Sequence, residues 1–395
     1  MKSIYYLGFF DTEENRCENR NTVLSATNKM TYIIEAIEKC GCSADVISAA
    51  HTLNPKKYPA KCLDIGEKSK LHLFASLPWG NKVRRVFSRL YSLDQVYRYI
   101  VDNLTGDDIL IAYHSTAYMS IIAKAKRKIG FKLVLEVEEI YADVTGTEAD
   151  RLKEERFFTL ADSYIFPTDL LNAHINREGK PFALIHGTYK VEPDRKCNIF
   201  DVDSQTAAKK KIHCVYAGTF DPRKGGAAAA AAAEFLPADY HVHILGFGSD
   251  ADTSAMKDLI ADVEKRSCAT VTYDGLLSGE EYIRFIQSCD IGLSTQNPDA
   301  AFNATSFPSK ILSYMANGLR VVSIRIPAIE GSAVGKYMYY YDKQTPEEIA
   351  KAIMAVDIND DYDGRSIISQ LDAELQHDLA KLLGRFHASG AVLHY

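Results

Sequence analysis

The sequence lacks the features that mark secreted, disulfide-bonded and membrane-spanning proteins. Its eight cysteines are scattered and none forms a Cys-x-x-Cys pair, so we expect reduced thiols in a reducing cytosol rather than a disulfide framework. No run approaches the roughly 18 consecutive apolar residues that a membrane span requires. Residues 1–8 lack the apolar stretch of a signal peptide. We therefore expect a soluble, cytoplasmic protein.

The sequence also lacks a dominant sign of charge. Lysine and arginine total 46 against 52 aspartates and glutamates, a formal net charge of −6. Bulk attraction to nucleic acid or anionic lipid is therefore not expected, although a local basic patch is compatible with these totals. The composition, 47% hydrophobic and 25% charged, is that of a soluble globular protein and excludes a disordered chain, a collagen-like repeat and a coiled coil.

Apolar runs of strand length alternate along the 395 residues with segments of helical periodicity. Such alternation implies βαβ units and parallel sheets. In the first half, strands are predicted at 3–7, 45–48, 71–75, 108–113, 132–137, 163–166 and 182–185, and long helices at 23–39 and 81–103. In the second half, strands are predicted at 211–216, 241–245, 270–273, 290–294 and 320–324, and helices at 227–235, 279–288, 309–317, 346–356 and 367–387.

A polar stretch, Val191–Lys211, separates the two series. We predict an α/β protein of two doubly wound, Rossmann-like parallel-sheet domains, residues 1–195 and 205–366, with a final helix in about 367–395 that crosses back onto the first domain. Ligands of open parallel sheets bind beyond the carboxyl ends of the strands, and two such sheets facing each other would enclose a cleft.

Three local patterns predict helix ends. Ser278–Glu281 has the sequence of a capping box, and the pair Thr345-Pro346 is typical of a helix N-cap followed by proline at the first helical position. Gly318 is expected just beyond a helix C-terminus, in the left-handed conformation. The seven alanines at 227–233 predict a tightly packed helix rather than a low-complexity segment, because alanine is the best helix former.

Two segments carry chemistry. Val215–Gly226 runs from a strand through a glycine turn and a basic pair, Arg223 and Lys224, into a helix. Glycine lets the backbone approach an anion, and a helix N-terminus offers unpaired N–H groups, so the segment fits a diphosphate cradle. The alternative is a tight strand–helix turn with solvated basic residues. In Ser306–Gly318, Lys310 lies in the first turn of a helix, where its charge would oppose the helix dipole unless an anion bound there; the alternative is an exposed lysine that points away.

Together these segments resemble the donor half of the retaining glycosyltransferases of family 4, which include many capsule and exopolysaccharide enzymes. The glycine loop matches the family pattern from Gly218 and Thr219 to Lys224 and Gly225. The next strands end at Gly246, Gly248 and Gly275, in the family's order. Phe307, Pro308, Ser309, Lys310 and Ser313 lie in its strongest signature. The likeness covers about 205–340 well, and the first half by architecture and fragments such as Leu135–Tyr141.

The resemblance implies a GT-B fold and transfer of a sugar from a UDP- or GDP-sugar to a glycan or lipid-linked acceptor, with retention, in cell-surface polysaccharide biosynthesis. Lys224, Lys310 and Arg223 would neutralise the departing diphosphate, which would itself accept the acceptor's proton. The glycines, Thr219, Phe307, Pro308, Ser309 and Ser313 would contact the donor. No metal or other cofactor would be required.

The sequence departs from this family at three positions. Its two glutamates, separated by seven intervening residues, are replaced by Thr305 and Ser313, and the arginine of its glycine loop by Thr219, which Arg223 would compensate. A serine hydroxyl hydrogen-bonds a ribose without the strength of a carboxylate. The alternative is a non-catalytic binding or scaffold partner of an active transferase; a non-hydrolysing epimerase would need acid–base carboxylates that the second half does not offer.

Candidates in the first half are His114, at a strand end where the family often has a sugar-contacting residue, and Glu138, one of three glutamates that could orient an acceptor hydroxyl. The alternatives are that His114 is a structural histidine and that the glutamates form a solvated strand edge. His241 and His243 share one strand face, and we expect them to be structural. The segment 82–89 is rich in basic residues, lies next to Trp79 and includes Phe87. It either binds an anionic membrane surface or belongs to an amphipathic helix exposed to solvent.

Overall fold

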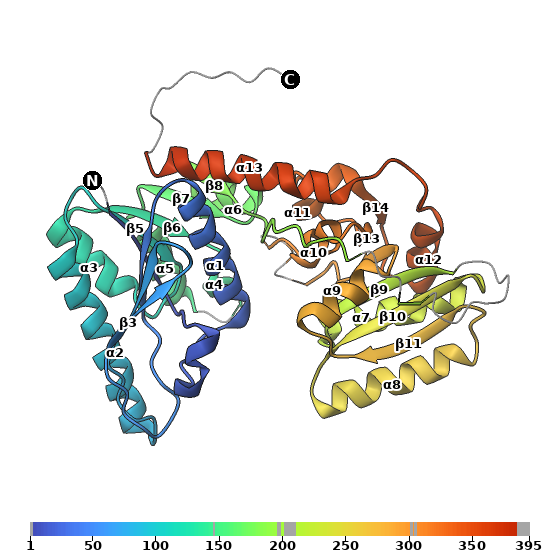
Figure 1. Cartoon of the computed structure of the whole chain (residues 1–395), viewed down its shortest axis with the longest axis horizontal. Helices are drawn as coiled ribbons and strands as arrows, with labels where there is room; N and C mark the ends of the chain where they lie inside the picture. The colour runs from blue at the N-terminus through green and yellow to red at the C-terminus, as the bar shows by residue number, and fades with distance from the viewer. Residues whose placement is uncertain are drawn as a thin grey trace, which may run out of the picture. The chain divides into compact units, whose positions relative to one another are not determined.

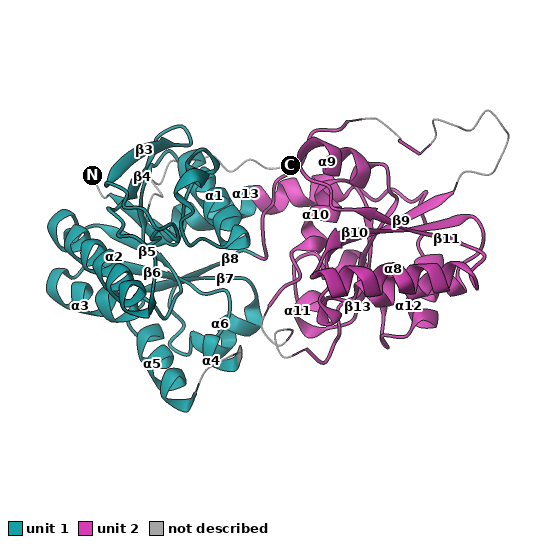
Figure 2. Cartoon of the chain, turned by 90° about the horizontal axis from the view of Figure 1, so that it is seen from below, with its two compact units in different colours: residues 1–185, 373–395 teal, residues 186–372 magenta. Residues whose placement is uncertain are grey.

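The computed structural model describes residues 3–144, 147–195, 199–200, 211–300, 303 and 306–384 (Figure 1). The chain divides into two compact units (Figure 2). Unit 1 comprises residues 1–185 and 373–395, and unit 2 comprises residues 186–372. The last helix, α13 (Gly364–Leu382), therefore begins in unit 2 and ends in unit 1, where the Cys40 thiol donates to the carbonyl of Gln376 at 3.3 Å.

Unit 1 is built on an eight-stranded sheet in the order β3-β4-β2-β1-β5-β6-β7-β8, parallel except for the β3–β4 pair. Its strands are β1 (Ile4–Gly8), β2 (Ala44–Ser48), β3 (Lys61–Ile65), β4 (Ser69–Leu73), β5 (Ile109–Tyr113), β6 (Lys132–Glu136), β7 (Ser163–Phe166) and β8 (Phe182–Leu184). Its helices are α1 (Leu24–Lys39), α2 (Lys82–Asn103), α3 (Met119–Ile129), α4 (Tyr141–Val144), α5 (Glu148–Phe158) and α6 (Asp169–Ile175), with a 3₁₀ turn η1 (Glu13–Glu18).

The central strands of unit 1 are apolar at every position because helices cover both faces of the sheet. Figure 1 shows α2 and α3 on one side and α1 on the other. Tyr5, Leu7 and Leu110 pack with the helices α2, α3 and α5 in one core cluster. The predicted strands of this half are all present. β3 was not predicted, because only alternate residues of this antiparallel edge strand are partly buried.

Unit 2 has a six-stranded, fully parallel sheet in the order β11-β10-β9-β12-β13-β14. Its strands are β9 (Ile212–Thr219), β10 (Tyr240–Phe247), β11 (Thr270–Gly275), β12 (Ile291–Ser294), β13 (Arg320–Ile324) and β14 (Met338–Tyr341). Its helical elements are η2 (Pro222–Lys224), α7 (Gly226–Ala232), η3 (Ala233–Phe235), α8 (Asp250–Glu264), α9 (Gly279–Gln287), α10 (Lys310–Ala316), α11 (Pro327–Glu330), η5 (Gly335–Tyr337), α12 (Pro346–Met354) and the start of α13.

The alanine run forms α7 and η3, as predicted, and it is packed rather than solvated. Ala229, Ala230, Ala232 and Ala233 are completely buried against β9, β10, α8 and α12. Small side chains let this helix lie close to the sheet. The turn before it is thereby held against the strand ends, where ligands of such sheets bind.

All three predicted helix ends are confirmed in position. The Thr345 side chain accepts the N–H of Glu348 with Pro346 at the first helical position, and Gly318 has φ +89° after α10. Ser278 is the N-cap of α9, but the predicted capping box is not formed, because the Ser278 side chain makes no capping hydrogen bond. Gly279, the first residue of α9, has φ +56°.

Candidate functional site

The two motif segments of unit 2 meet at the carboxyl end of β9. A Cβ atom built on Gly218 would lie 3.2 Å from the Nζ of Lys310, so the side chain of α10 reaches back to the glycine turn. Lys224, in η2 on the other side of this turn, is close enough for its charge to lower the pKa of Lys310. The structure therefore brings together the two lysines that the sequence placed 86 positions apart.

Lys310 is an ammonium group without a matching anion. Within the described part of the chain its Nζ is buried and has no hydrogen-bond partner. It lies 3.8 Å from the centroid of the Tyr216 ring, a cation–π contact that offsets part of the cost of burial. Burial, with a smaller contribution from Lys224, lowers the pKa of Lys310 to about 7. An anion bound beside Nζ would supply the missing partner and restore the charge.

Tyr216 and Tyr314 fix the geometry of this site. The Tyr216 hydroxyl donates to the carbonyls of Thr219, at 2.9 Å, and Lys224, at 3.2 Å, and so closes the turn between them. The Tyr314 hydroxyl accepts the N–H of Ala217 at 2.8 Å and ties α10 to β9. Gly292 of β12 leaves the space for the Tyr314 ring, because a Cβ there would lie 2.3 Å from the ring's Cγ.

Two of the predicted glycines are required by close backbone approaches. Gly225 has φ +83°, and a Cβ there would lie 1.7 Å from the carbonyl oxygen of Thr295. Gly246 has φ +142°, and a Cβ there would lie 1.7 Å from the carbonyl oxygen of Gly218. Only glycine is compatible with both the positive φ and the close backbone contact at these two positions. By contrast, Gly275 has φ +84° with open space around it. Gly248 does not have a left-handed φ, but a Cβ there would lie 2.7 Å from the Asp252 Cβ.

Arg223 is already engaged by an anion of its own turn. Its Nε and Nη2 donate to the two carboxylate oxygens of Asp221, at 3.0 and 2.6 Å, and its side chain is 65% exposed. The hydrogen bonds from Arg223 lower the pKa of Asp221 to about 2. Among the described residues, Arg223 thus has an anionic partner and the amino group of Lys310 has none, and a role for Arg223 at a diphosphate stays a prediction.

The residues just before α10 pack against His186 and Gly187, the first residues of unit 2. Phe307 is buried, and its ring centroid lies 5.0 Å from that of His186. The lack of a side chain at Gly187 leaves room for Ser309. Pro308 is half-buried and Ser309 is exposed. Ser313, one turn into α10, interacts with the Tyr282 hydroxyl, which burial keeps protonated by raising its pKa. The other substituted glutamate position, Thr305, lies outside the described residues.

The first-half candidates lie in a separate cluster of unit 1. Glu138 forms an ion pair with Lys29, which also donates to the carbonyl of Ile185 at 3.1 Å. Next to it, Glu136 is fully buried and accepts the Tyr6 hydroxyl. Burial, reinforced by the charge of Glu138, raises the pKa of Glu136 to about 8, so this carboxyl is mostly protonated at pH 7. Glu136 is one of the three glutamates at this strand end that were proposed from the sequence to orient an acceptor hydroxyl, whereas Lys29 was not among the predicted residues.

His114 lies inside the core of unit 1, with 1% of its surface exposed. Its ring packs on Tyr141, Phe157 and Phe158, and its Nε2 lies 3.3 Å from Glu154 Oε1. Burial lowers the pKa of His114 to about 4, so it is neutral at physiological pH. This placement fits a packing role, and contact of His114 with a sugar stays a prediction.

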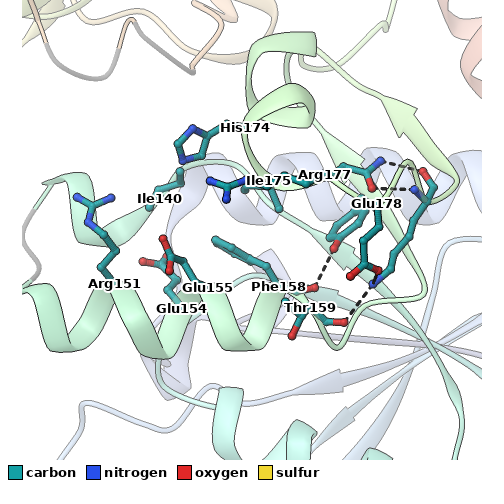
Figure 3. Close-up of a pocket in the computed structure, with 13 residues that line it drawn as sticks. Ile140, Arg151, Glu154, Glu155, Phe158, Thr159, His174, Ile175, Arg177 and Glu178 are labelled. Carbon is teal, nitrogen blue, oxygen red and sulfur yellow. Dashed lines mark hydrogen bonds and ion pairs between the residues drawn. The ribbon is translucent and has the colours of Figure 1, made fainter.

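A pocket of about 250 Å³ in unit 1 contains none of the predicted residues. Figure 3 shows Arg151, Glu154 and Glu155 of α5 along one wall, with His174 and Arg177 opposite. Glu154 links the pocket to the His114 ring, but both of its oxygens already accept backbone N–H groups of α4, at 2.9 Å each. The carboxylate therefore positions α4.

No family model matches the chain, and no curated protein matches it. The chain does match solved structures. Sucrose-phosphate synthase from Thermosynechococcus elongatus is 14% identical with a TM-score of 0.66, covering 99% of this chain and 100% of that one. HepE from Anabaena, in complex with UDP and glucose, is 13% identical with a TM-score of 0.63, covering 98% and 100%. An α,α-trehalose-6-phosphate synthase from Burkholderia multivorans is 10% identical with a TM-score of 0.60, covering 99% and 100%. The chain has the GT-B fold, as predicted.

Proposed function

We propose that the chain is a retaining, family 4-like glycosyltransferase that moves a sugar from a nucleotide-sugar donor to a glycan or lipid-linked acceptor in cell-surface polysaccharide biosynthesis. The observation that carries the proposal is the buried amino group of Lys310, which has no hydrogen-bond partner among the residues that the structure describes and lies near Lys224 at the strand ends of the second sheet. Structures of the same fold include a complex with UDP, which supports a UDP-sugar as the donor.

In this function the two lysines act on the leaving group. As the bond from the sugar to the diphosphate breaks, negative charge grows on the phosphate oxygens, and Lys310 and Lys224 neutralise it from opposite sides of the glycine turn. Lys310 acts in a site of low dielectric, where its charge is worth more than in water. In unit 1, Glu138, held by Lys29, orients the acceptor hydroxyl.

Calorimetry of the full chain with UDP and GDP tests the donor site. In free protein Lys310 is charged below about pH 7 and neutral above it, and a bound diphosphate raises its pKa. We expect UDP affinity to fall by up to about tenfold per pH unit above pH 7, with a proton taken up on binding at pH 8 that appears as a buffer-dependent enthalpy. Binding that is independent of pH would contradict the assignment of Lys310.

A second candidate function is a non-catalytic binding or scaffold partner of an active transferase. Ser313, in place of a ribose-binding glutamate, favours it, because its side chain already interacts with Tyr282. The same calorimetry separates the two functions. A well-folded sample that binds neither nucleotide at pH 6.5, where Lys310 is charged, would identify the scaffold.

Helix α2 supports peripheral contact with an anionic membrane. Its first turns expose an apolar stripe at helical spacing, with each side chain between 55% and 63% exposed: Val83, Val86, Phe87 and Leu90. Basic side chains flank the stripe, and those of Arg85 and Arg89 lie over the Trp79 ring. Among the described helices none has the length and apolar character to cross a bilayer. The surface suits an enzyme whose acceptor is lipid-linked.

Sedimentation with vesicles of phosphatidylglycerol and phosphatidylcholine tests this contact. We expect the protein to sediment at low salt and to be released by salt, because exposed charges are screened. The double variant Arg84→Glu/Arg89→Glu is expected to stay in the supernatant. The control Arg127→Glu/Lys128→Glu, on α3, makes the same change of net charge and is expected to sediment like the wild type. Wild-type protein that does not sediment at low salt would remove the membrane contact and leave the transferase proposal standing.

A further inference from the structure

Three histidines of unit 2 converge on one face of its sheet, at the opposite end of β9 from the lysine site. In the register of β9 and β10, His213 lies beside His241, and His243 follows two residues later on the same face. One ring nitrogen of each lies within 4.8 Å of the others, and His213 Nδ1 is 2.9 Å from His243 Nε2. His213 lies five residues before Gly218, roughly 16 Å along the strand.

Hydrogen bonds to β11 fix which nitrogens carry protons. The Thr272 hydroxyl donates to Asp274 Oδ2 at 2.8 Å, so at 3.0 Å it accepts from His241 Nε2–H, leaving His241 Nδ1 as a lone pair. His243 Nδ1 lies 3.2 Å from the same carboxylate oxygen and donates to it, leaving His243 Nε2 as a lone pair that accepts from His213 Nδ1–H at 2.9 Å. A metal ion that binds His213 Nδ1 displaces this proton, which passes to His213 Nε2 or to solvent. An imidazole held by a carboxylate in this way is the usual arrangement of a metal-binding histidine.

The surroundings partly shield the imidazoles from water. Phe200 stacks on His213 at 4.2 Å and on His243 at 4.7 Å. Burial, with the neighbouring histidines, lowers the pKa of His241 to about 3. The charged groups that face this ring are Asp274 and Lys211. Neutral imidazole is the form that binds a metal ion.

A surface pocket lies beside the cluster. It is lined by Asp274, by Phe285, which packs edge-on against His243, and by three charged residues of α9: Glu280, Glu281 and Arg284. Glu280 pairs with Arg195, so the lining carries charges of both signs.

We propose that His213, His241 and His243 bind a zinc ion, with Asp274 orienting His243 and a solvent molecule completing the coordination. Three imidazole nitrogens suit Zn²⁺, whereas Mg²⁺ and Ca²⁺ prefer oxygen ligands. Tetrahedral bonds of about 2.0–2.1 Å separate neighbouring nitrogens by about 3.3 Å. The His213–His243 pair must therefore open by a few tenths of an ångström and His241 must move inward, within the reach of side-chain rotation. Because the cluster lies far from Lys310, the ion stabilises the start of the second sheet and takes no part in sugar transfer.

Metal binding to the full chain tests the site. Chelator-treated protein is titrated with Zn²⁺ against a chromophoric chelator, and with Co²⁺ by absorption spectroscopy. We expect one ion per chain, a higher thermal midpoint, and a tetrahedral Co²⁺ spectrum without thiolate charge-transfer bands. The absence of thiolate bands distinguishes binding at the histidines from binding at the exposed cysteines Cys17, Cys62 and Cys268. Mg²⁺ is expected to have no effect.

Variants locate the ion. His243→Gln is expected to lose the binding, and Asp274→Asn, which keeps all three ligands, to weaken it by about 10- to 100-fold. His174→Ala, an exposed histidine of unit 1, is the control and should bind like the wild type. UDP affinity should be the same with and without Zn²⁺, so failure of the metal site leaves the transferase proposal intact. Absent Zn²⁺ binding, or binding unchanged in Asp274→Asn and His243→Gln, would reduce the three rings to a hydrogen-bonded packing cluster.

Discussion

Replacing Lys310 with alanine is expected to lower sugar transfer by about 100- to 1,000-fold, the usual cost of removing one group that stabilises transition-state charge. The protein should nevertheless stay folded, with a thermal midpoint equal to or above that of the wild type. The reason is that Nζ of Lys310 is buried without a hydrogen-bond partner among the described residues, so the variant loses only the contact with Tyr216 and is relieved of an isolated charge. The rate with a UDP-sugar and the thermal midpoint are measured on the same sample.

Two further variants make the result specific. Lys224→Ala, on the other side of the glycine turn, should also lose most of the transfer activity. Lys351→Ala is the matched control, because Lys351 is an exposed lysine of unit 2 that pairs with Glu348 on α12. Near wild-type turnover in both Lys310→Ala and Lys224→Ala would defeat the assignment of the diphosphate site.

Much of the fold could be predicted because buried parallel strands leave a strong signature. β1, β7 and β13 are short and mostly apolar runs, and their predicted ranges agree with the structure to within a residue or so. β14 was missed because Met338–Tyr341 consists of three tyrosines and a methionine, a pattern shared by many segments that are not strands. Edge strands are only partly covered, so the apolar pattern that reveals a strand is weakest there.

The donor-site residues could be proposed from motif spacing, but their electrostatics could not. Nothing in Ser306–Gly318 shows that Lys310 is buried, because its environment comes from Tyr216, on a strand more than ninety residues earlier. The same limit applied to His213. His241 and His243 are two residues apart and visible as a pair, whereas His213 joins them only through the register of β9 against β10, which the packing of α7 sets.

The apolar stripe of α2 shows a limit of another kind. Helical spacing placed Val83, Val86, Phe87 and Leu90 on one face, and such a face usually packs into the core. In the structure Ser88, Ser92, Val96 and Ile100 are the buried face instead, and the more apolar stripe is exposed. Periodicity finds a face but not what covers it, since that depends on which neighbouring element is in reach.

Gly225→Ala is expected to destabilise unit 2 by about 4 kcal/mol and to abolish transfer, whereas Gly275→Ala should cost only about 1–2 kcal/mol of stability. The two glycines have the same backbone conformation, φ +83° and +84°, so the strain of a left-handed alanine is common to both variants. They differ in space: a Cβ at Gly225 would lie 1.7 Å from the carbonyl oxygen of Thr295, while nothing lies within 4 Å of one at Gly275.

The difference between the two variants therefore isolates the close approach of the glycine turn to the loop after β12. Relief of the clash must move either Thr295, whose hydroxyl donates to the Gly225 carbonyl at 2.7 Å, or the turn that holds Lys224. Either movement separates Lys224 from Lys310, so UDP affinity should fall together with stability. Denaturation midpoints in urea and UDP titrations on both variants measure the two effects. Equal losses in Gly225→Ala and Gly275→Ala would show that conformation alone, and not the contact with Thr295, makes glycine necessary at the head of α7.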